Sequence, residues 1–238
     1  IRQRAGIERR HILEEDKACS DLAAEAGRKA LEESGLTAED LDIIIIATIT
    51  PDMLFPSTAC RVQAKIGAKN AAAFDISAAC SGFVYGVTVA DSLIKSGVAK
   101  HILVVGSEIL SRVTDWEDRS TCVLFGDAAG GVVMGPSDGE KGVLSTYIKS
   151  NGKLGHLLHQ PGGGSLNPAT HETVEQRLHY IKMEGRDVFK HAVRSMKEAA
   201  LKGLKRAGVT SDELDLLITH QANIRIIEAL GSRLKMEK

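Results

Sequence analysis

The sequence predicts an α/β fold built on parallel sheets. Helical and strand-like patterns alternate along the chain, which places helices over the faces of sheets. The runs at residues 41–47 and 101–106 are continuously apolar, as expected for strands covered on both faces. A segment near the end of the chain also repeats one near its start, which indicates an internal duplication.

The first half of the chain carries the clearest pattern. Residues 21–34 are rich in Ala, Glu and Leu and stop at Gly35, which predicts a helix. Residues 80–96 are nearly all apolar and stop at Gly97, which predicts a buried helix. The strands predicted in this half are residues 41–47, 72–76 and 101–106.

The second half is less regular. Short apolar runs predict strands at residues 130–134, 142–148 and 214–219. Residues 152–173 form a glycine-rich, histidine-bearing loop region. An amphipathic pattern predicts a helix at residues 187–207.

The internal duplication rests on one pair of segments. Residues 34–48 (SGLTAEDLDIIIIAT) resemble residues 207–221 (AGVTSDELDLLITHQ), each after a predicted helix. A helix–turn–strand unit capped by Thr is a common local solution and would also explain the match. The length of the match between the two segments favours a true duplication, with two halves at residues 1–149 and 150–238 related by a pseudo-twofold axis. Equivalent strand ends would then face a shared site at the carboxyl edges of the sheets.

Composition excludes several classes of function. Hydrophobic residues make up 43% and charged residues 26%, and the formal net charge is -1, so we expect neither nucleic acid nor membrane as a partner. The apolar run at 43–47 is far shorter than the roughly 20 residues of a membrane span. The first residues lack the apolar core of a signal peptide.

The cysteines and histidines point to a cytoplasmic protein without metal. The four cysteines lack CxxC spacing, so we expect free thiols in a reducing cytoplasm. His156 and His159 could bind metal, but a solvated loop explains them better. The chain starts and ends with residues typical of the middle of a domain, so we expect a fragment truncated at both ends.

Cys80 is the first candidate catalytic residue. It follows a strand and a run of small residues and precedes a helix, in the segment AFDISAACSGFVYG. Backbone N–H groups and the helix dipole at this position favour the thiolate and should lower the pKa of the thiol. A thiolate accepts acyl groups well. From these residues alone, an inert cysteine in a small-residue packing seam remains equally possible.

His220 is the second candidate. It comes directly after a predicted buried strand, in the segment LLITHQANIRII. Polar residues at the carboxyl end of a strand are typical of active sites in α/β folds. A neutral imidazole there can donate a hydrogen bond to a carbonyl oxygen that gains charge. The alternative is a loop whose Asn and Gln only cap the following helix.

Together these segments resemble a known family. DISAACSGF, LFGDAAGGVV and HQANIRII are similar to the signature segments of β-ketoacyl-acyl-carrier-protein synthase III, and the resemblance extends over essentially the whole chain. It implies a duplicated thiolase-like α/β fold, layered α-β-α-β-α. It also implies an acyltransferase that condenses a short acyl-CoA, with acetyl-CoA as the default, with malonyl-acyl-carrier protein. The products are 3-ketoacyl-carrier protein and CO2, and the reaction initiates fatty-acid synthesis.

The resemblance also assigns roles to single residues. It implies that Cys80 is the acylated nucleophile and His220 the catalytic histidine, with a third catalytic residue, an Asn, expected beyond Lys238. Phe55 would enter the acyl pocket of the second subunit of a homodimer. The residues implied to bind CoA or substrate are Arg4, Arg119, Phe125, Phe189 and Asn223, and those implied to dock the acidic carrier protein are Lys190 and Arg225. Loss of CO2 supplies the carbanion, so no cofactor and no metal are expected.

Two alternatives remain at this stage. One is another condensing enzyme of the thiolase superfamily, such as a starter synthase for polyketides. The other is an inactive homologue that only binds CoA or carrier protein. The presence of both Cys80 and His220 favours an enzyme, because a binding module needs neither residue.

Overall fold

The computed structural model describes residues 5–139 and 141–235, and the chain divides into two compact units. One unit comprises residues 11–109 and 126–146 and is called the Cys80 unit here. The other comprises residues 1–10, 110–125 and 147–238 and is called the His220 unit. The predicted division of the chain between residues 149 and 150 stays a prediction.

A four-stranded sheet forms the centre of the Cys80 unit. Its strands are β1 (Ile43–Ala47), β2 (Ala72–Ile76), β3 (Ile102–Ile109) and β4 (Asp127–Met134), in the order β2-β1-β3-β4. β1 pairs in parallel with both β2 and β3, whereas β4 runs antiparallel to β3. The predicted parallel core is therefore confirmed, and the carboxyl ends of three strands meet at one edge.

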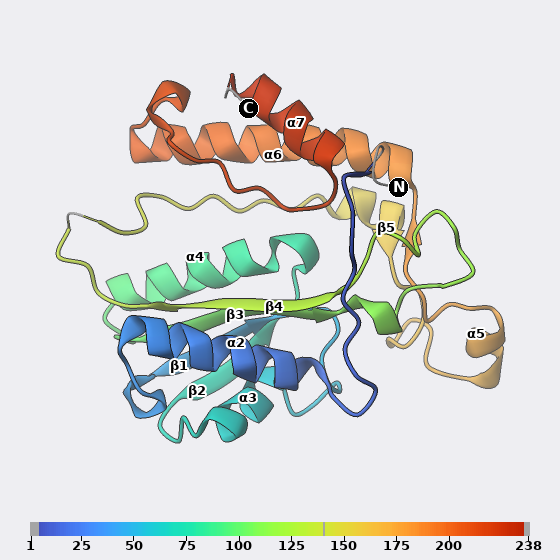
Figure 1. The fold of residues 1–238 in the computed structure, drawn as a ribbon, viewed down its shortest axis with the longest axis horizontal. Helices are drawn as coiled ribbons and strands as arrows, with labels where there is room; N and C mark the ends of the chain where they lie inside the picture. Colours follow the sequence, from blue (N-terminus) through green and yellow to red (C-terminus); the bar gives the residue numbers. More distant parts are fainter. Residues whose placement is uncertain (1–4, 140, 236–238) are drawn as a thin grey trace. The chain divides into compact units, whose positions relative to one another are not determined.

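Helices cover both faces of this sheet (Figure 1). α2 (Cys19–Ser34) and α3 (Thr58–Ile66) lie on one face, and α4 (Gly82–Lys95) lies on the other. The four isoleucines of β1 alternate between the two faces, as a strand requires. Ile44 and Ile46 belong to the core cluster under α2 and α3, and Ile43 and Ile45 to the cluster under α4.

Two glycines allow α4 to lie close to the sheet. A Cβ atom on Gly82 would lie 2.9 Å from the Cβ of Ala47 in β1. A Cβ atom on Gly86 would lie 2.7 Å from Cγ1 of Val104 in β3. Side chains at these positions would therefore push the helix away from the strands. This contact sets where the amino end of α4 meets the carboxyl edge of the sheet.

The regular elements of the His220 unit are mostly helices. Its longest helix, α6 (Gly185–Ala207), packs against α7 (Ile224–Arg233). The short elements are a two-stranded antiparallel sheet and short helices: β5 (Leu158–His159), β6 (Lys182–Met183), α5 (His171–Glu175), and the 3-10 helices at Leu110–Arg112, Gly152–Leu157 and Ser211–Glu213.

Most predicted elements are present. The helices predicted at 21–34, 80–96 and 187–207 correspond to α2, α4 and α6, and the predicted strands of the first half correspond to β1, β2 and β3. The strand predicted at 130–134 is the carboxyl part of β4. α3 was missed although its ends carry local signals, since the Ser57 side chain accepts a hydrogen bond from Cys60 N and Gly67 ends the helix with a φ of 78°. Its first turn is also stabilised by the carboxylate of Asp75 on β2, which accepts hydrogen bonds from Thr58 N and Ala59 N, both at 2.7 Å.

Two predicted strands are wrong. Residues 142–148 and 214–219 are not in regular structure, although both carry apolar runs. Backbone groups form a strand only when a neighbouring strand supplies ladder hydrogen bonds, and neither segment has such a neighbour within the part of the chain that the structure describes. Leu216 and Ile218 are accordingly 70% and 80% exposed.

Within the described residues, no helix combines the length and the apolar character needed to cross a bilayer.

The close contact of α4 leads to a stability prediction. We expect Gly86→Ala to lower the free energy of unfolding by about 1–3 kcal/mol, because the added methyl overpacks the contact with Val104. Gly231→Ala in α7 is the matched control, since nothing lies within 4 Å of its added Cβ. We expect it to leave stability unchanged or raise it by up to about 1 kcal/mol. Chemical denaturation measures both, and equal effects of the two variants would contradict the packing argument.

Candidate active site

Cys80 lies in a tight turn between β2 and α4. β2 ends at Ile76, and Cys80 is the central residue of the 3-10 turn Ala79–Ser81, which leads directly into α4. The cysteine is exposed to solvent and not in a disulfide. The turn therefore presents a free thiol next to the amino end of a fourteen-residue helix.

The backbone of this turn is strained. Ala79 has a φ of 45°, in the left-handed region that residues with a Cβ rarely adopt. Such a conformation costs about 1–2 kcal/mol and persists only where surrounding contacts enforce it. Strained residues of this kind gather at functional sites. The strain supports an active role for the adjacent Cys80.

The expected lowering of the Cys80 pKa is not what the structure supports. Although the residue is exposed, the protein atoms around its thiol desolvate it and raise its pKa, and the negative charge of Glu108 raises the pKa further. A hydrogen bond from the backbone lowers the pKa, but by less than desolvation raises it. In the free protein the thiol form is therefore favoured more than the helix position alone suggested.

Sequence reasoning assigned no role to Glu108, which lies near the end of β3. Its carboxylate accepts hydrogen bonds from Ile49 N at 2.9 Å and from the hydroxyls of Thr48 and Thr50. The sequence signal was present, since Glu108 is an acidic residue inside an otherwise apolar strand pattern. Such a residue must find partners at the end of the sheet.

His220 lies in an irregular segment of the His220 unit, four residues before α7 begins at Ile224. The imidazole is accessible to solvent, but the surrounding protein atoms desolvate it and lower its pKa. Because the charged form is disfavoured, His220 is neutral at neutral pH and can donate one hydrogen bond. This is the protonation state that polarisation of a carbonyl requires.

The residues after His220 cap the next helix. Oδ1 of Asn223 accepts a hydrogen bond from Ile226 N at 3.1 Å, which makes Asn223 the N-cap of α7. Nε2 of Gln221 donates to the carbonyl of Thr219 at 3.2 Å. The HQAN segment therefore does form the helix-capping loop considered from sequence. Among the described residues, these hydrogen bonds of the loop do not involve the His220 ring.

Arg119 lies in an exposed turn that an ion pair holds in place. The guanidinium of Arg177 donates to both carboxylate oxygens of Asp115, and Nζ of Lys182 lies 3.6 Å from the same carboxylate. The hydrogen bonds from Arg177 are the main reason that the pKa of Asp115 falls to about 2. Asp115 thus ties the segment that presents Arg119 to residues 177–182.

The other residues implied by the resemblance fall in both units. Phe55 belongs to the Cys80 unit and is 84% exposed on the loop after β1. The remaining positions belong to the His220 unit: Phe125 is half-buried, Phe189 and Lys190 lie near the start of α6 and Arg225 is the second residue of α7, all three of them exposed. Arg4 lies outside the described residues.

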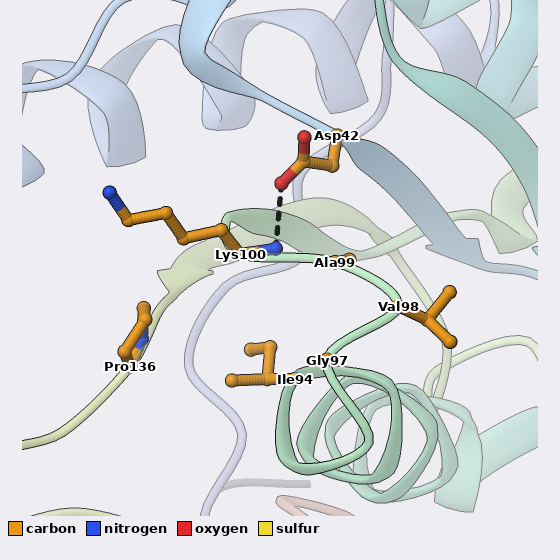
Figure 2. A pocket seen from close by; sticks show the side chains of 7 residues that line it. All are labelled: Asp42, Ile94, Gly97, Val98, Ala99, Lys100 and Pro136. Atoms are coloured by element: carbon orange, nitrogen blue, oxygen red, sulfur yellow. Dashed lines mark hydrogen bonds between the residues drawn. The ribbon is translucent and has the colours of Figure 1, made fainter.

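The pocket in Figure 2 lies away from Cys80 in the same unit. It is lined by Asp42, Ile94, Gly97, Val98, Ala99, Lys100 and Pro136. Asp42 precedes β1 and Lys100 precedes β3, so the pocket opens at the amino ends of these strands. The Asp42 carboxylate accepts hydrogen bonds from Lys100 N at 2.7 Å and His101 N at 2.9 Å. It therefore supplies partners for the backbone N–H groups just before β3. We assign this pocket no part in the chemistry.

Among the described residues, no group of three or more His, Cys, Asp or Glu side chains is arranged to hold a metal ion. His156 and His159 therefore have no further ligand around them in this part of the chain.

Comparison with known proteins identifies the family. A model of 3-oxoacyl-[acyl-carrier-protein] synthase III matches residues 74–152. The β-ketoacyl-[acyl-carrier-protein] synthase III of Caldanaerobacter subterraneus subsp. tengcongensis is 53% identical over 99% of this chain and 71% of its own length. That of Clostridioides difficile is 52% identical over 100% of this chain and 72% of its own length.

The chain belongs to the β-ketoacyl-acyl-carrier-protein synthase III family.

Solved structures agree with this assignment. The 3-oxoacyl-[acyl-carrier-protein] synthase III of Aquifex aeolicus VF5 matches with a TM-score of 0.89 and 49% identity, over 99% of this chain and 71% of that protein. The priming β-ketosynthase of the R1128 polyketide pathway matches with a TM-score of 0.89 and 34% identity, over 99% of this chain and 70% of its own. The predicted thiolase-like α/β fold is thereby confirmed, and the synthase is a condensing enzyme of the transferase class.

The ion pair beside Arg119 gives a pH-dependent prediction. We expect Asp115→Asn to lower the melting temperature at pH 7, because it removes the negative charge and replaces one of the two oxygens that accept hydrogen bonds from Arg177 with an NH2 group. The pKa of Asp115 is depressed from 3.8 to about 2, so its contribution is complete above the higher value and is lost as the pH falls through the lower one. The difference in melting temperature between Asp115→Asn and the unchanged chain should therefore shrink as the pH falls from 4 to 2.

Glu117→Gln is the control for this experiment. Glu117 also approaches Arg177, at 3.3 Å, but its side chain is 80% exposed, so its loss should have little effect. A stability difference for Asp115→Asn that persists unchanged at pH 2 would contradict the assignment.

Proposed function

We propose that the chain catalyses the decarboxylative Claisen condensation of a short acyl-CoA, by default acetyl-CoA, with malonyl-acyl-carrier protein. The products are 3-ketoacyl-carrier protein and CO2, the first step of chain building in fatty-acid synthesis. Membership of the synthase family supports this reaction. The observation that carries it is the free, exposed thiol of Cys80 on a strained turn at the start of α4.

In the first stage, Cys80 accepts the acyl group. Its sulfur forms a bond to the thioester carbonyl carbon, and the carbon–sulfur bond to CoA breaks. The proton of the thiol leaves with the CoA sulfur, so that acyl-Cys80 and free CoA remain. Backbone N–H groups at the start of α4 are suited to stabilise the oxyanion that forms in between.

In the second stage, His220 stabilises an enolate. The neutral imidazole donates a hydrogen bond to the thioester carbonyl of malonyl-carrier protein, as its lowered pKa favours. The bond to the carboxylate breaks and CO2 leaves, with its electron pair forming the enolate. The enolate carbon then attacks the carbonyl of acyl-Cys80, and the thiolate of Cys80 leaves.

No metal or redox cofactor enters this proposal. The carbanion comes from the departing CO2, so no external base, Lewis acid or electron carrier has to be supplied. Coenzyme A takes part as the carrier of the substrate. Arg119, Phe125, Phe189 and Asn223 are the described residues that we propose to contact CoA or substrate.

We further propose acyl carrier protein and a second copy of the chain as partners. Lys190 and Arg225 are exposed cations on two packed helices, α6 and α7, and suit an acidic carrier. The 84% exposed Phe55 suits insertion into a second subunit. The free cysteines are in keeping with a cytoplasmic location.

Loading of the nucleophile is the first test of this function. After incubation with acetyl-CoA, we expect intact mass to show one added acetyl group and peptide mapping to place it on Cys80. Cys80→Ser should abolish loading, whereas the matched variants Cys60→Ser and Cys122→Ser should retain it, because both thiols are half-buried and outside the turn. Circular dichroism verifies the fold of each variant.

Two outcomes of the loading test would change the proposal. An acetyl group on another cysteine, or loading that survives Cys80→Ser, would refute the role of Cys80. Loading by longer acyl-CoAs in place of acetyl-CoA would point to another starter synthase of the same fold.

The second stage is tested with His220→Ala. We expect this variant to load acyl groups at the normal rate and to lose about 100-fold or more of CO2 release from malonyl-carrier protein, because the enolate loses its hydrogen-bond donor. His156→Ala, another exposed histidine of the same unit, should retain both activities. If His220→Ala lost loading and kept CO2 release, the proposed role of His220 would be wrong.

A further inference from the structure

Glu108 occupies the α4 side of the sheet at its carboxyl edge. Side chains along β3 alternate between the faces. The hydroxyl of Ser107 contacts Sγ of Cys19 in α2 at 3.3 Å, so Ser107 points to the α2 face. A Cβ on Gly106 would instead meet Phe83 of α4 at 3.7 Å. Glu108 follows Ser107 and therefore shares the α4 face with Gly106.

The carboxylate of Glu108 is fixed by a directed set of hydrogen bonds. The Thr50 hydroxyl accepts from Ile109 N at 2.8 Å, which leaves its own proton for Oε2 of Glu108. The Thr48 hydroxyl accepts from Thr50 N at 3.0 Å and lies 3.3 Å from the same oxygen. With Ile49 N on Oε1, both oxygens are held, and the carboxyl group cannot turn away from the sheet edge.

Cys80 lies at the same edge on the same side. In the sheet, Ala47 of β1 pairs with Ile76 of β2 and with Gly106 of β3, so these three residues form one row at the carboxyl edge. The amino end of α4 lies on this row, because Gly82 contacts Ala47. Cys80 precedes Gly82 by two residues, and Glu108 follows Gly106 by two.

The charges agree with this placement. Desolvation raises the pKa of Glu108, and the negative charge of Glu108 is in turn one of the reasons that the pKa of the Cys80 thiol is raised. Two other carboxylates near the sheet edge interact with other residues. Asp52 pairs with Arg61 and binds Ser20, and Asp75 caps α3.

Two more titratable groups lie on neighbouring elements. Asp127 on β4 accepts a hydrogen bond from Leu13 N at 2.8 Å. Cys19 on α2 is buried on the other face, with its pKa raised mainly by desolvation and also by the negative charge of Glu108. The Thr48 hydroxyl lies 3.5 Å from Sγ of Cys19. The charge of Glu108 therefore acts on both thiols, and Cys80 is the exposed one of the two. Of the carboxylates Asp52, Asp75, Glu108 and Asp127, only Glu108 contributes to the raised pKa of the Cys80 thiol.

We infer that Glu108 is a positioning residue for Cys80: a carboxylate locked at the sheet edge by Thr48, Ile49 and Thr50, whose charge opposes ionisation of the nucleophile in the free enzyme. The inference rests on the proposed function in that Cys80 is the nucleophile. The positive amino end of the α4 dipole favours the thiolate of Cys80, and the negative charge of Glu108 disfavours it. The thiol is thus kept from unspecific alkylation and oxidation, which require the thiolate.

The test measures the pH profile of Cys80 alkylation. Iodoacetamide reacts with the thiolate, so the midpoint of rate against pH, followed on the Cys80 peptide, reports the ionisation of this thiol. Glu108→Gln removes the charge and keeps an acceptor for Ile49 N. We expect the midpoint to fall and the alkylation rate at pH 7 to rise about threefold or more, since a lower pKa leaves a larger fraction of the thiol ionised at this pH.

Two variants serve as controls. Glu108→Asp keeps the charge and should leave the midpoint close to that of the unchanged chain. Asp42→Asn removes one negative charge at the opposite edge of the same sheet, in the pocket of Figure 2, and should not move the midpoint. An unchanged midpoint in folded Glu108→Gln would overturn the inference. An equal shift in Asp42→Asn would also overturn it, since net charge alone would then be responsible.

A reciprocal measurement needs no variant at Glu108. Because the coupling between two ionisable sites is mutual, a negative charge placed on Cys80 must raise the pKa of Glu108. The chain alkylated at Cys80 with iodoacetate, which adds a carboxylate, should titrate Glu108 at a higher pH than the chain alkylated with neutral iodoacetamide. Side-chain carboxyl NMR measures this difference, and equal titrations would overturn the inference even if Glu108→Gln fails to fold.

The two proposals fail separately. Alkylation depends only on thiol ionisation, so a shift in Glu108→Gln without acetyl loading would uphold the inference and reject the proposed function. Acetyl loading on Cys80 with no shift of the alkylation midpoint in any variant would support the proposed function and overturn the inference.

Discussion

The in-register pairing of three parallel strands determines where chemistry is possible in the Cys80 unit. Ile76 and Ala47 end β2 and β1 and lie in one row with Gly106 of β3, which continues to Ile109. The chain leaves the sheet near this row, which exposes backbone and polar side chains at one edge. The turn that holds Cys80 follows β2, and the loop that holds Thr48 and Thr50 follows β1. Glu108 is the last residue but one of β3.

The contact between α4 and the sheet converts this edge into a site. Only glycine fits at positions 82 and 86, because Ala47 and Val104 occupy the space of a side chain. The helix therefore lies close to the strands, and its amino end is held beside the cysteine, where Ala79 is forced into a left-handed conformation. Desolvation that accompanies this packing raises the pKa of the Cys80 thiol and outweighs the influence of the backbone hydrogen bond.

Much of this could be predicted from the sequence, for reasons that differ between elements. β1 was predictable because four consecutive isoleucines make a buried strand wherever they are paired. Cys80 and His220 were found because each follows a strand-like run and carries reactive chemistry. α3 was missed although Ser57 and Gly67 mark its ends locally, whereas the contact of Asp75, a residue of β2, with its first turn could not be read from the sequence. Residues 214–219 were predicted as a strand, but apolar side chains alone do not supply the ladder that a strand needs.

The sequence by itself determined the fold class and the family and predicted which side chains react, because periodicity, glycine positions and signature segments are local properties of the chain. The tertiary structure decided the direction in which the pKa values of those side chains are shifted. Whether a cysteine at a helix start is a thiol or a thiolate depends on the atoms and charges around it, and residues distant in sequence supply them, as Glu108 does. The pKa of His220 is likewise shifted by its surroundings, since desolvation by the protein lowers it.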